Sequence, residues 1–370
     1  MAIDLVGFGI VLPILPLYAK RFHTTSFEAT LLVAVFSAAS LVCSPLWGRI
    51  SDRFGRKPVL LVSLAGTAVG SLITGLAGGL ALLLVGRIID GASGASVSVA
   101  QAAAADLSGP KDRARLFGLL GAAFGVGFVA GPALGSLAAL GGPRLPFFLA
   151  AGIATVNTGV AARRLPETHG SRPRPRRSGL QAVRAVAPML VVTFLALVAF
   201  SGFEATFALF GSRHLGLGIA STAAVFTVVG AVIVAVQGGL VYRVVRVLGE
   251  TTTLMAGLLA NAGGLALLAT ARTWAVAVPA LAALTVGQGL VQTTMVAIVA
   301  GRAEPGWRGS VLGVQQSTGG LARVIGPAVG GVLLGTAASG LPYVLGAVLS
   351  LLAAAVVVAV SVRNRSAAAP

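Results

Sequence analysis

Charged side chains are scarce in this 370-residue chain. Only 10% of the residues are charged, whereas 56% are hydrophobic, and the mean hydropathy is +0.94. Such a composition excludes a water-soluble domain, because too few charges remain to cover a surface that faces water. The apolar runs predict an all-α polytopic membrane protein.

Cysteine and histidine are nearly absent as well. The single cysteine, Cys43, lies in an apolar run, so neither an intrachain disulfide nor a cluster of metal-binding thiolates can form. The three histidines (His23, His169 and His214) fall in or near loops, which argues against a metal site inside the membrane. The sequence also has no phosphate-binding loop, no serine-nucleophile elbow and no His-Glu-x-x-His pair. We therefore expect no enzyme activity, no cofactor and no direct use of ATP.

The basic residues are placed as membrane topology requires. Lysine and arginine outnumber acids by 27 to 10, giving a formal net charge of +17. They lie in short loops and not along an amphipathic face, which argues against a nucleic-acid partner. By inferred location, twenty lie in inner loops and the C-terminal tail, five in outer loops, and two, Arg87 and Arg323, within spans. The positive-inside bias then places both termini in the cytoplasm, as in a multi-pass protein of the bacterial inner (plasma) membrane.

The most informative stretch is residues 48–58, GRISDRFGRKP, between apolar runs at 29–47 and 59–76. Each run is close to the ~20 residues that a membrane helix needs. Four cations place the turn on the cytoplasmic side, and a plain basic anchor would explain them. Glycines at 48 and 55 permit close backbone approach or a positive φ, and Asp52 can cap a helix or pair with a cation.

This stretch resembles the loop between the second and third helices of the major facilitator superfamily. The resemblance implies twelve transmembrane helices in two pseudo-symmetric six-helix bundles, with this loop latching the cytoplasmic side. The residues implied for this cytoplasmic gate are Gly48, Asp52, Arg53, Gly55, Arg56 and, from the next inner loop, Arg113.

The first apolar run adds a second resemblance. Its pattern of Asp4, two glycines and two prolines is similar to the first helix of the twelve-helix drug/proton antiporters, such as the tetracycline exporters. From Asp4 to Tyr18 a helix would rise only about 21 Å, short of the ~30 Å of hydrocarbon. We therefore expect part of this helix to precede Met1.

Three further ionisable residues fall inside predicted spans. Arg87 and Asp90 are three residues apart, so they share one helix face and can neutralise each other. Glu204 lies among phenylalanines, and an apolar surrounding disfavours the charged form of a carboxyl group, which suits proton loading; a helix-end glutamate in contact with water is equally compatible. Charges at membrane depth are functional by default. The candidates for proton coupling are Asp4, Arg87, Asp90 and Glu204.

Glycines four residues apart predict close helix packing in the fifth span. Gly127, Gly131, Pro132 and Gly135 resemble the antiporter motif of the superfamily. A Gly-Pro-x-x-Gly sequence returns 195 residues later at 326–330, and the 48–58 pattern returns in part at an offset of 190. The expected organisation is an N-terminal bundle (1–162), an Arg/Pro-rich cytoplasmic linker (163–186), a C-terminal bundle (187–362) and a cytoplasmic tail (363–370).

Polar and aromatic side chains within spans could line a central cavity, or the amides could form hydrogen bonds between helices. The candidate cavity residues are Gln101, Phe203, Phe207, Gln288, Gln292 and Gln315.

These features predict a secondary active transporter, acting as a monomer by alternating access, that exports a small amphipathic molecule or drug in exchange for protons. The alternatives are a symporter or facilitator for a nutrient such as a sugar or an organic acid, and a non-transporting membrane sensor. The expected partners are the substrate, protons and the lipid bilayer.

Overall fold

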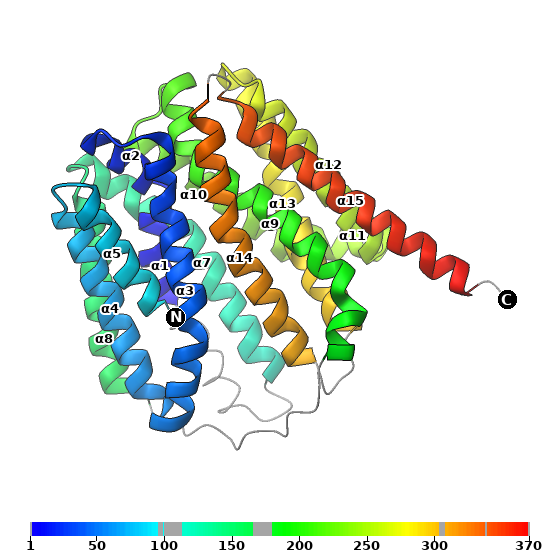
Figure 1. The fold of residues 1–370 in the computed structure, drawn as a ribbon, viewed down its shortest axis with the longest axis horizontal. Helices are drawn as coiled ribbons and strands as arrows, with labels where there is room; N and C mark the ends of the chain where they lie inside the picture. Colours follow the sequence, from blue (N-terminus) through cyan, green and yellow to red (C-terminus); the bar gives the residue numbers. More distant parts are fainter. Residues whose placement is uncertain are drawn as a thin grey trace. The chain divides into compact units, whose positions relative to one another are not determined.

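The computed structural model describes residues 2–94, 99, 113–165, 180–302, 308–336 and 339–368 (Figure 1). Within these ranges every regular element is a helix, as the apolar runs predicted. The elements are α1 (Ala2–Val11), α2 (Leu15–Ala19), η1 (Lys20–Phe22), α3 (Ser26–Phe54), α4 (Arg56–Leu76), α5 (Leu80–Ser93), α7 (Arg113–Leu140), α8 (Leu145–Arg164), α9 (Leu180–His214), α10 (Ile219–Ala235), the π-helical η2 (Val236–Leu240), α11 (Val241–Leu248), α12 (Glu250–Ala269), α13 (Trp274–Arg302), α14 (Arg308–Leu334) and α15 (Leu341–Ala368).

Nine helical stretches in the described part of the chain are long and apolar enough to cross a membrane. The first predicted span is a tenth if its bent halves count as one, because α1 and α2 meet at a 43° bend. Pro13 explains this break, since proline in a helix interior removes a backbone hydrogen bond and crowds the preceding turn. Helices α5 and α7 occupy the predicted fourth and fifth places, with 14 and 28 residues described.

Local sequence signals explain where the charged turn begins and ends. The long α3 starts at a capping box in which Thr25 Oγ1 accepts from the Glu28 backbone N–H at 3.2 Å and Glu28 Oε2 accepts from the Thr25 N–H at 2.7 Å. It ends at Gly55, whose φ of +99° is available to glycine at little cost and reverses the chain into α4.

Contacts within the chain define two compact units. Unit 1 comprises Met1–Arg174 and Gly216–Gly230, and unit 2 comprises Pro175–Leu215 and Ala231–Pro370. In unit 1, α1 packs on α7 and α8, and α5 lies against α3 and α4. In unit 2, α9 packs on α14 and α15, and α12 packs on α13 and α15. The start of α10 joins unit 1 because Ser136 Oγ of α7 donates to the Ala220 carbonyl at 2.8 Å.

Candidate functional site

The strongest charged feature of unit 1 is a buried ion pair on α5. Arg87 Nη1 donates to Asp90 Oδ2 at 2.7 Å, and the Arg87 side chain is only 2% exposed. The two residues therefore meet on one helix face, as their spacing predicted. A guanidinium so deeply buried is stable only when its charge is compensated nearby.

Three neighbouring helices, α1, α3 and α4, complete the surroundings of this pair. The guanidinium of Arg87 lies over the ring of Phe36 from α3, with its central carbon 4.3 Å from the ring centroid, in a cation–π arrangement. Asp4 of α1 interacts electrostatically with Asp90, and Thr67 of α4 forms a hydrogen bond to it. Of the four predicted coupling residues, the structure thus places Arg87 and Asp90 in direct contact and Asp4 near enough to act electrostatically on Asp90; we call these three residues the charged group.

This group is not fully satisfied. Among the described residues, Nε of Arg87 is a buried donor with no hydrogen-bond partner. A buried donor without a partner costs free energy, and such groups mark places where a water or another ligand can enter. Sequence reasoning missed Phe36, because an aromatic residue in an apolar run carries no signal that it will face a cation.

The fourth coupling candidate, Glu204, lies on α9 in unit 2. It is partly buried, and its neighbours on the helix, Phe203 and Phe207, pack their rings together with centroids 5.3 Å apart. Arg323 of α14 acts electrostatically on this carboxyl group. The sequence analysis assigned no role to Arg323, although it counted Arg323 as one of two cations within spans.

The predicted cytoplasmic gate forms the α3–α4 turn. Arg56 is buried and its Nη1 donates to Ser51 Oγ at 2.5 Å, while the Arg53 guanidinium lies 5.3 Å from the ring centroid of Phe54. Gly55 has the positive φ that the sequence analysis allowed for. Gly48 lies inside α3, and a Cβ there would meet nothing within 4 Å, so close packing does not explain a glycine at this position. The side chains of Asp52 and Arg113 lie outside the described residues.

The glycines of the antiporter motif pack directly against α1. A Cβ at Gly131 would lie 2.6 Å from Cα of Gly9, one at Gly127 would lie 2.5 Å from Cβ of Leu5, and one at Gly135 would lie 3.1 Å from the Ile10 carbonyl oxygen. Pro132 lies inside α7 at this contact. The predicted close packing of this helix is confirmed.

The related sequence in the second half makes a similar contact inside unit 2. A Cβ at Gly326 of α14 would lie 2.7 Å from the Val198 carbonyl oxygen of α9, and one at Gly330 would lie 3.5 Å from that of Gly202. Ser201 Oγ donates to the Ala322 carbonyl at 3.1 Å across the same contact.

The predicted cavity amides that the structure describes all form hydrogen bonds between elements of unit 2. Asn261 Nδ2 donates to Gln288 Oε1 at 3.1 Å, and Gln237 Nε2 donates to Gln292 Oε1 at 2.9 Å. Gln315 is 8% exposed, and its Nε2 lies 3.4 Å from Thr193 Oγ1. Phe203 and Phe207 are fully buried. Gln101 lies outside the described residues, and the assignment of these residues to a cavity stays a prediction.

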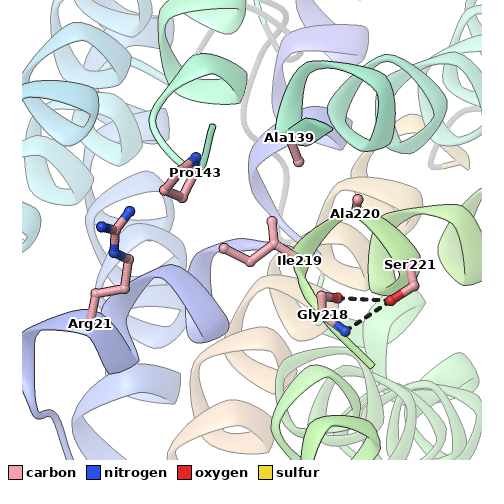
Figure 2. A pocket seen from close by; sticks show the side chains of 7 residues that line it. All are labelled: Arg21, Ala139, Pro143, Gly218, Ile219, Ala220 and Ser221. Atoms are coloured by element: carbon pink, nitrogen blue, oxygen red, sulfur yellow. Dashed lines mark hydrogen bonds between the residues drawn. The ribbon is translucent and has the colours of Figure 1, made fainter. Parts of the chain in front are cut away.

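A separate pocket of about 630 Å³ lies within unit 1, where the ends of several helices meet (Figure 2). Figure 2 shows Arg21 on one side of it and Ile219 projecting from the start of α10, while Ser221 Oγ closes a turn with the Gly218 N–H at 2.8 Å. None of the predicted site residues lines it. Its lining consists of Arg21, Ala139, Pro143, Gly218, Ile219, Ala220 and Ser221.

The chain is similar in sequence and in fold to known membrane transporters. The chain is 32% identical over 370 residues to the tetracycline resistance protein, class C, of Escherichia coli, covering 95% of this chain and 92% of that protein. It is 28% identical to multidrug resistance protein 2 of Bacillus subtilis (strain 168), covering 89% and 85% of the two chains. The crystal structure of the human organic anion transporter MFSD10 (TETRAN) superposes with a TM-score of 0.72 at 25% identity, over 96% of both chains.

The sequence model of one protein family, the Major Facilitator Superfamily, matches residues 1–327. That match covers most of the chain, and it agrees with the helices that can span a membrane. The chain therefore belongs to the Major Facilitator Superfamily and is a multi-pass membrane transporter, not an enzyme.

Proposed function

We propose that this protein exports a small amphipathic drug in exchange for protons. The observation that carries the proposal is the buried Arg87–Asp90 pair with Asp4 acting on it. Three ionisable groups at membrane depth are costly unless they serve transport or proton movement. The relatives named for tetracycline and multidrug resistance support export of a drug as the task.

Proton exchange at this group needs a carboxyl group that can be either paired or protonated. Asp90 as a carboxylate accepts the hydrogen bond of Arg87, and a proton on Asp90 would weaken that bond and release the guanidinium. A transmembrane potential of 100 mV contributes ~2.3 kcal/mol per charge, and one pH unit adds ~1.4 kcal/mol. One proton could therefore drive substrate accumulation of several hundred-fold.

The packing of glycines in both units supports two related bundles. The contact of α7 with α1 in unit 1 and that of α14 with α9 in unit 2 use the same Gly-Pro-x-x-Gly sequence. We extend this to twelve spans in two pseudo-symmetric halves joined by the arginine-rich linker, which alternate access to one cavity as a monomer. Both termini would be cytoplasmic, with the turn at Gly55 and Asp52 as the latch that closes on that side.

The test is transport by purified protein in proteoliposomes, with tetracycline as the probe and a pH-sensitive dye inside. An imposed proton gradient should drive tetracycline against its own gradient, and tetracycline added without a gradient should move protons the opposite way. The Arg87→Gln/Asp90→Asn protein should lose this exchange. Exchange that persists in the variant would show that the pair is structural.

A symporter for a nutrient such as a sugar or an organic acid is the second candidate, and the similarity to a human organic anion transporter gives it weak support. In the same vesicles it would move protons and substrate in the same direction. If neither drugs nor nutrients produce flux in any vesicle, the non-transporting sensor becomes the better interpretation.

A further inference from the structure

Arg323 lies at the centre of a membrane span and is nevertheless exposed. The span Val311–Leu334 places it twelve residues from one end, about 18 Å along the helix. Half the hydrocarbon thickness is about 15 Å, so the Cα of Arg323 lies near the middle of the membrane, far from the lipid headgroups. An arginine at this depth persists where it meets water or a partner and not where it meets lipid.

The rest of α14 identifies which of its faces meets water. Gly313, Gln316, Gly320 and Arg323 follow a spacing of three, four and three, which keeps them within about 80° of the helix circumference. All four are exposed or partly exposed. This set, which we call the polar stripe, contains no large apolar side chain.

The two other faces of α14 have different surroundings. Leu321 and Val332 are 45% and 56% exposed and lie on a side centred about 130° from the polar stripe, as expected for contact with lipid. Ala322 and Gly326 are buried against α9. Between Gly313 and Arg323 the helix thus has one face packed on protein, one apolar exposed face and one polar exposed face, the polar stripe; beyond Arg323 the same side is buried at Pro327 and Leu334.

The packed face brings Glu204 to the edge of the polar stripe. Ser201 Oγ of α9 donates to the Ala322 carbonyl at 3.1 Å, and Ala322 is next to Arg323 in α14. Glu204 follows Ser201 by three residues, so it lies on nearly the same side of α9. Arg323 acts electrostatically on its carboxyl group.

Other charged or titratable groups on the elements around Glu204 are few in the described chain. Tyr343 of α15 has its hydroxyl 3.4 Å from Thr206 Oγ1, and Arg213 and His214 lie at the end of α9, at least nine residues away. On α13, Arg302 lies in the last turn. Arg323 is therefore the group best placed to balance the charge of Glu204.

We propose that the polar stripe of α14 lines the water-filled transport path, and that Arg323 is the positioning residue that serves as counter-ion to Glu204. When Glu204 releases its proton to water, the carboxylate pairs with Arg323; when a proton returns from water, the pair is broken. This second exchange group would lie in unit 2, as the Arg87–Asp90 pair lies in unit 1. The counter-ion role rests on the proposed function, whereas the water-facing stripe does not.

The first experiment measures water access by cysteine labelling. Because Cys43 is the only cysteine, Cys43→Ser gives a cysteine-free background. On it, Gln316→Cys and the matched control Leu321→Cys are placed on the same helix, and the purified proteins in lipid nanodiscs are treated with a charged methanethiosulfonate reagent. Since a thiolate reacts only where water reaches it, the Gln316→Cys protein should react at least about tenfold faster. Equal rates, or faster reaction at position 321, would overturn the assignment of the faces.

The second experiment measures the pH profile of tetracycline–proton exchange in proteoliposomes. Arg323→Gln removes the charge that favours ionised Glu204, so the pH of half-maximal exchange should rise by about one unit or more. Arg323→Lys keeps the positive charge and should return the profile close to that of the unmodified protein. Arg272→Gln, which changes an exposed arginine in the loop between α12 and α13, should leave the profile unchanged.

An unchanged profile in Arg323→Gln would refute the counter-ion role. A shift of the same size in Arg272→Gln would refute it too, because the effect would then not be local. If the unmodified protein exchanges no tetracycline for protons, the proposed function fails, and the labelling rates still decide which face of α14 meets water.

Discussion

Removing the charge of Asp90 should destabilise the protein more than removing the charge of its partner Arg87. In Asp90→Asn, a guanidinium that is 2% exposed loses the carboxylate 2.7 Å away and keeps its own charge, because arginine cannot give up its proton in proteins. Breaking a buried pair in this way costs about 3 to 5 kcal/mol. In Arg87→Gln the orphaned carboxyl group can take up a proton and become neutral, so we expect the lower end of that range or less.

The loss of stability in each variant can be measured by thermal denaturation of the purified protein in detergent. For a folding unit of this size, each kcal/mol shifts the midpoint by about 2 to 4 °C. Asp90→Asn should then lower it by about 10 °C, Arg87→Gln by about half as much, and the double variant by less than Asp90→Asn alone. The matched control is Glu28→Gln, a solvent-accessible carboxylate in the capping box of α3, which should lower the midpoint much less because glutamine can keep the same hydrogen bond.

Two outcomes would refute this reasoning. If Arg87→Gln is the less stable of the two single variants, proton uptake does not relieve the orphaned carboxyl group. If Asp90→Asn has the same denaturation midpoint as the unmodified protein, the charge of Arg87 is not buried in the way the structure shows. A double variant that folds but exchanges no protons would in addition separate coupling from stability.

Three further predictions concern glycines and the latch. Gly131→Ala should lower the denaturation midpoint by on the order of 5 °C, because its Cβ would lie 2.6 Å from the backbone of Gly9, whereas Gly152→Ala on α8, with nothing within 4 Å, should leave it unchanged or raise it. Gly55→Ala should cost about 1 to 3 kcal/mol through its φ of +99°, seen as a lower midpoint and weaker transport. Asp52→Asn should impair tetracycline efflux from vesicles at unchanged membrane levels of the protein; undiminished efflux would contradict the latch.

Most helices of the fold could be predicted from the sequence, because spans of about twenty apolar residues and short charged turns leave few other structures in a membrane. The turn at Gly55 and the packing of Gly131 on α1 followed from residue types whose backbone requirements are strict. The predicted role of Gly48 did not follow, since a glycine in a helix looks the same in the sequence whether or not another helix touches it.

The charged group was only half predictable. Arg87 and Asp90 share one helix, so their contact follows from helical spacing. Phe36, Asp4 and Arg323 reach their partners across separate helices, and which faces of two helices meet depends on packing that an apolar sequence does not encode. Most side chains of a membrane helix are apolar whether they touch lipid or protein, so the periodicity of apolar residues is a weak guide to which faces meet.

Gln315 and Gln316 show that two adjacent residues on one helix can have different surroundings that the sequence does not reveal. The sequence analysis listed Gln315 as a candidate cavity residue, which stays a prediction. In the structure Gln315 is buried with its amide near Thr193, whereas Gln316, two turns before Arg323 on the polar stripe, is exposed. Neighbouring residues differ by about 100° around a helix, so one position separates a residue that packs from one that meets water. Once Arg323 is recognised as a charge that cannot face lipid, the face of α14 is fixed, and Gln316 follows from it by helical spacing alone.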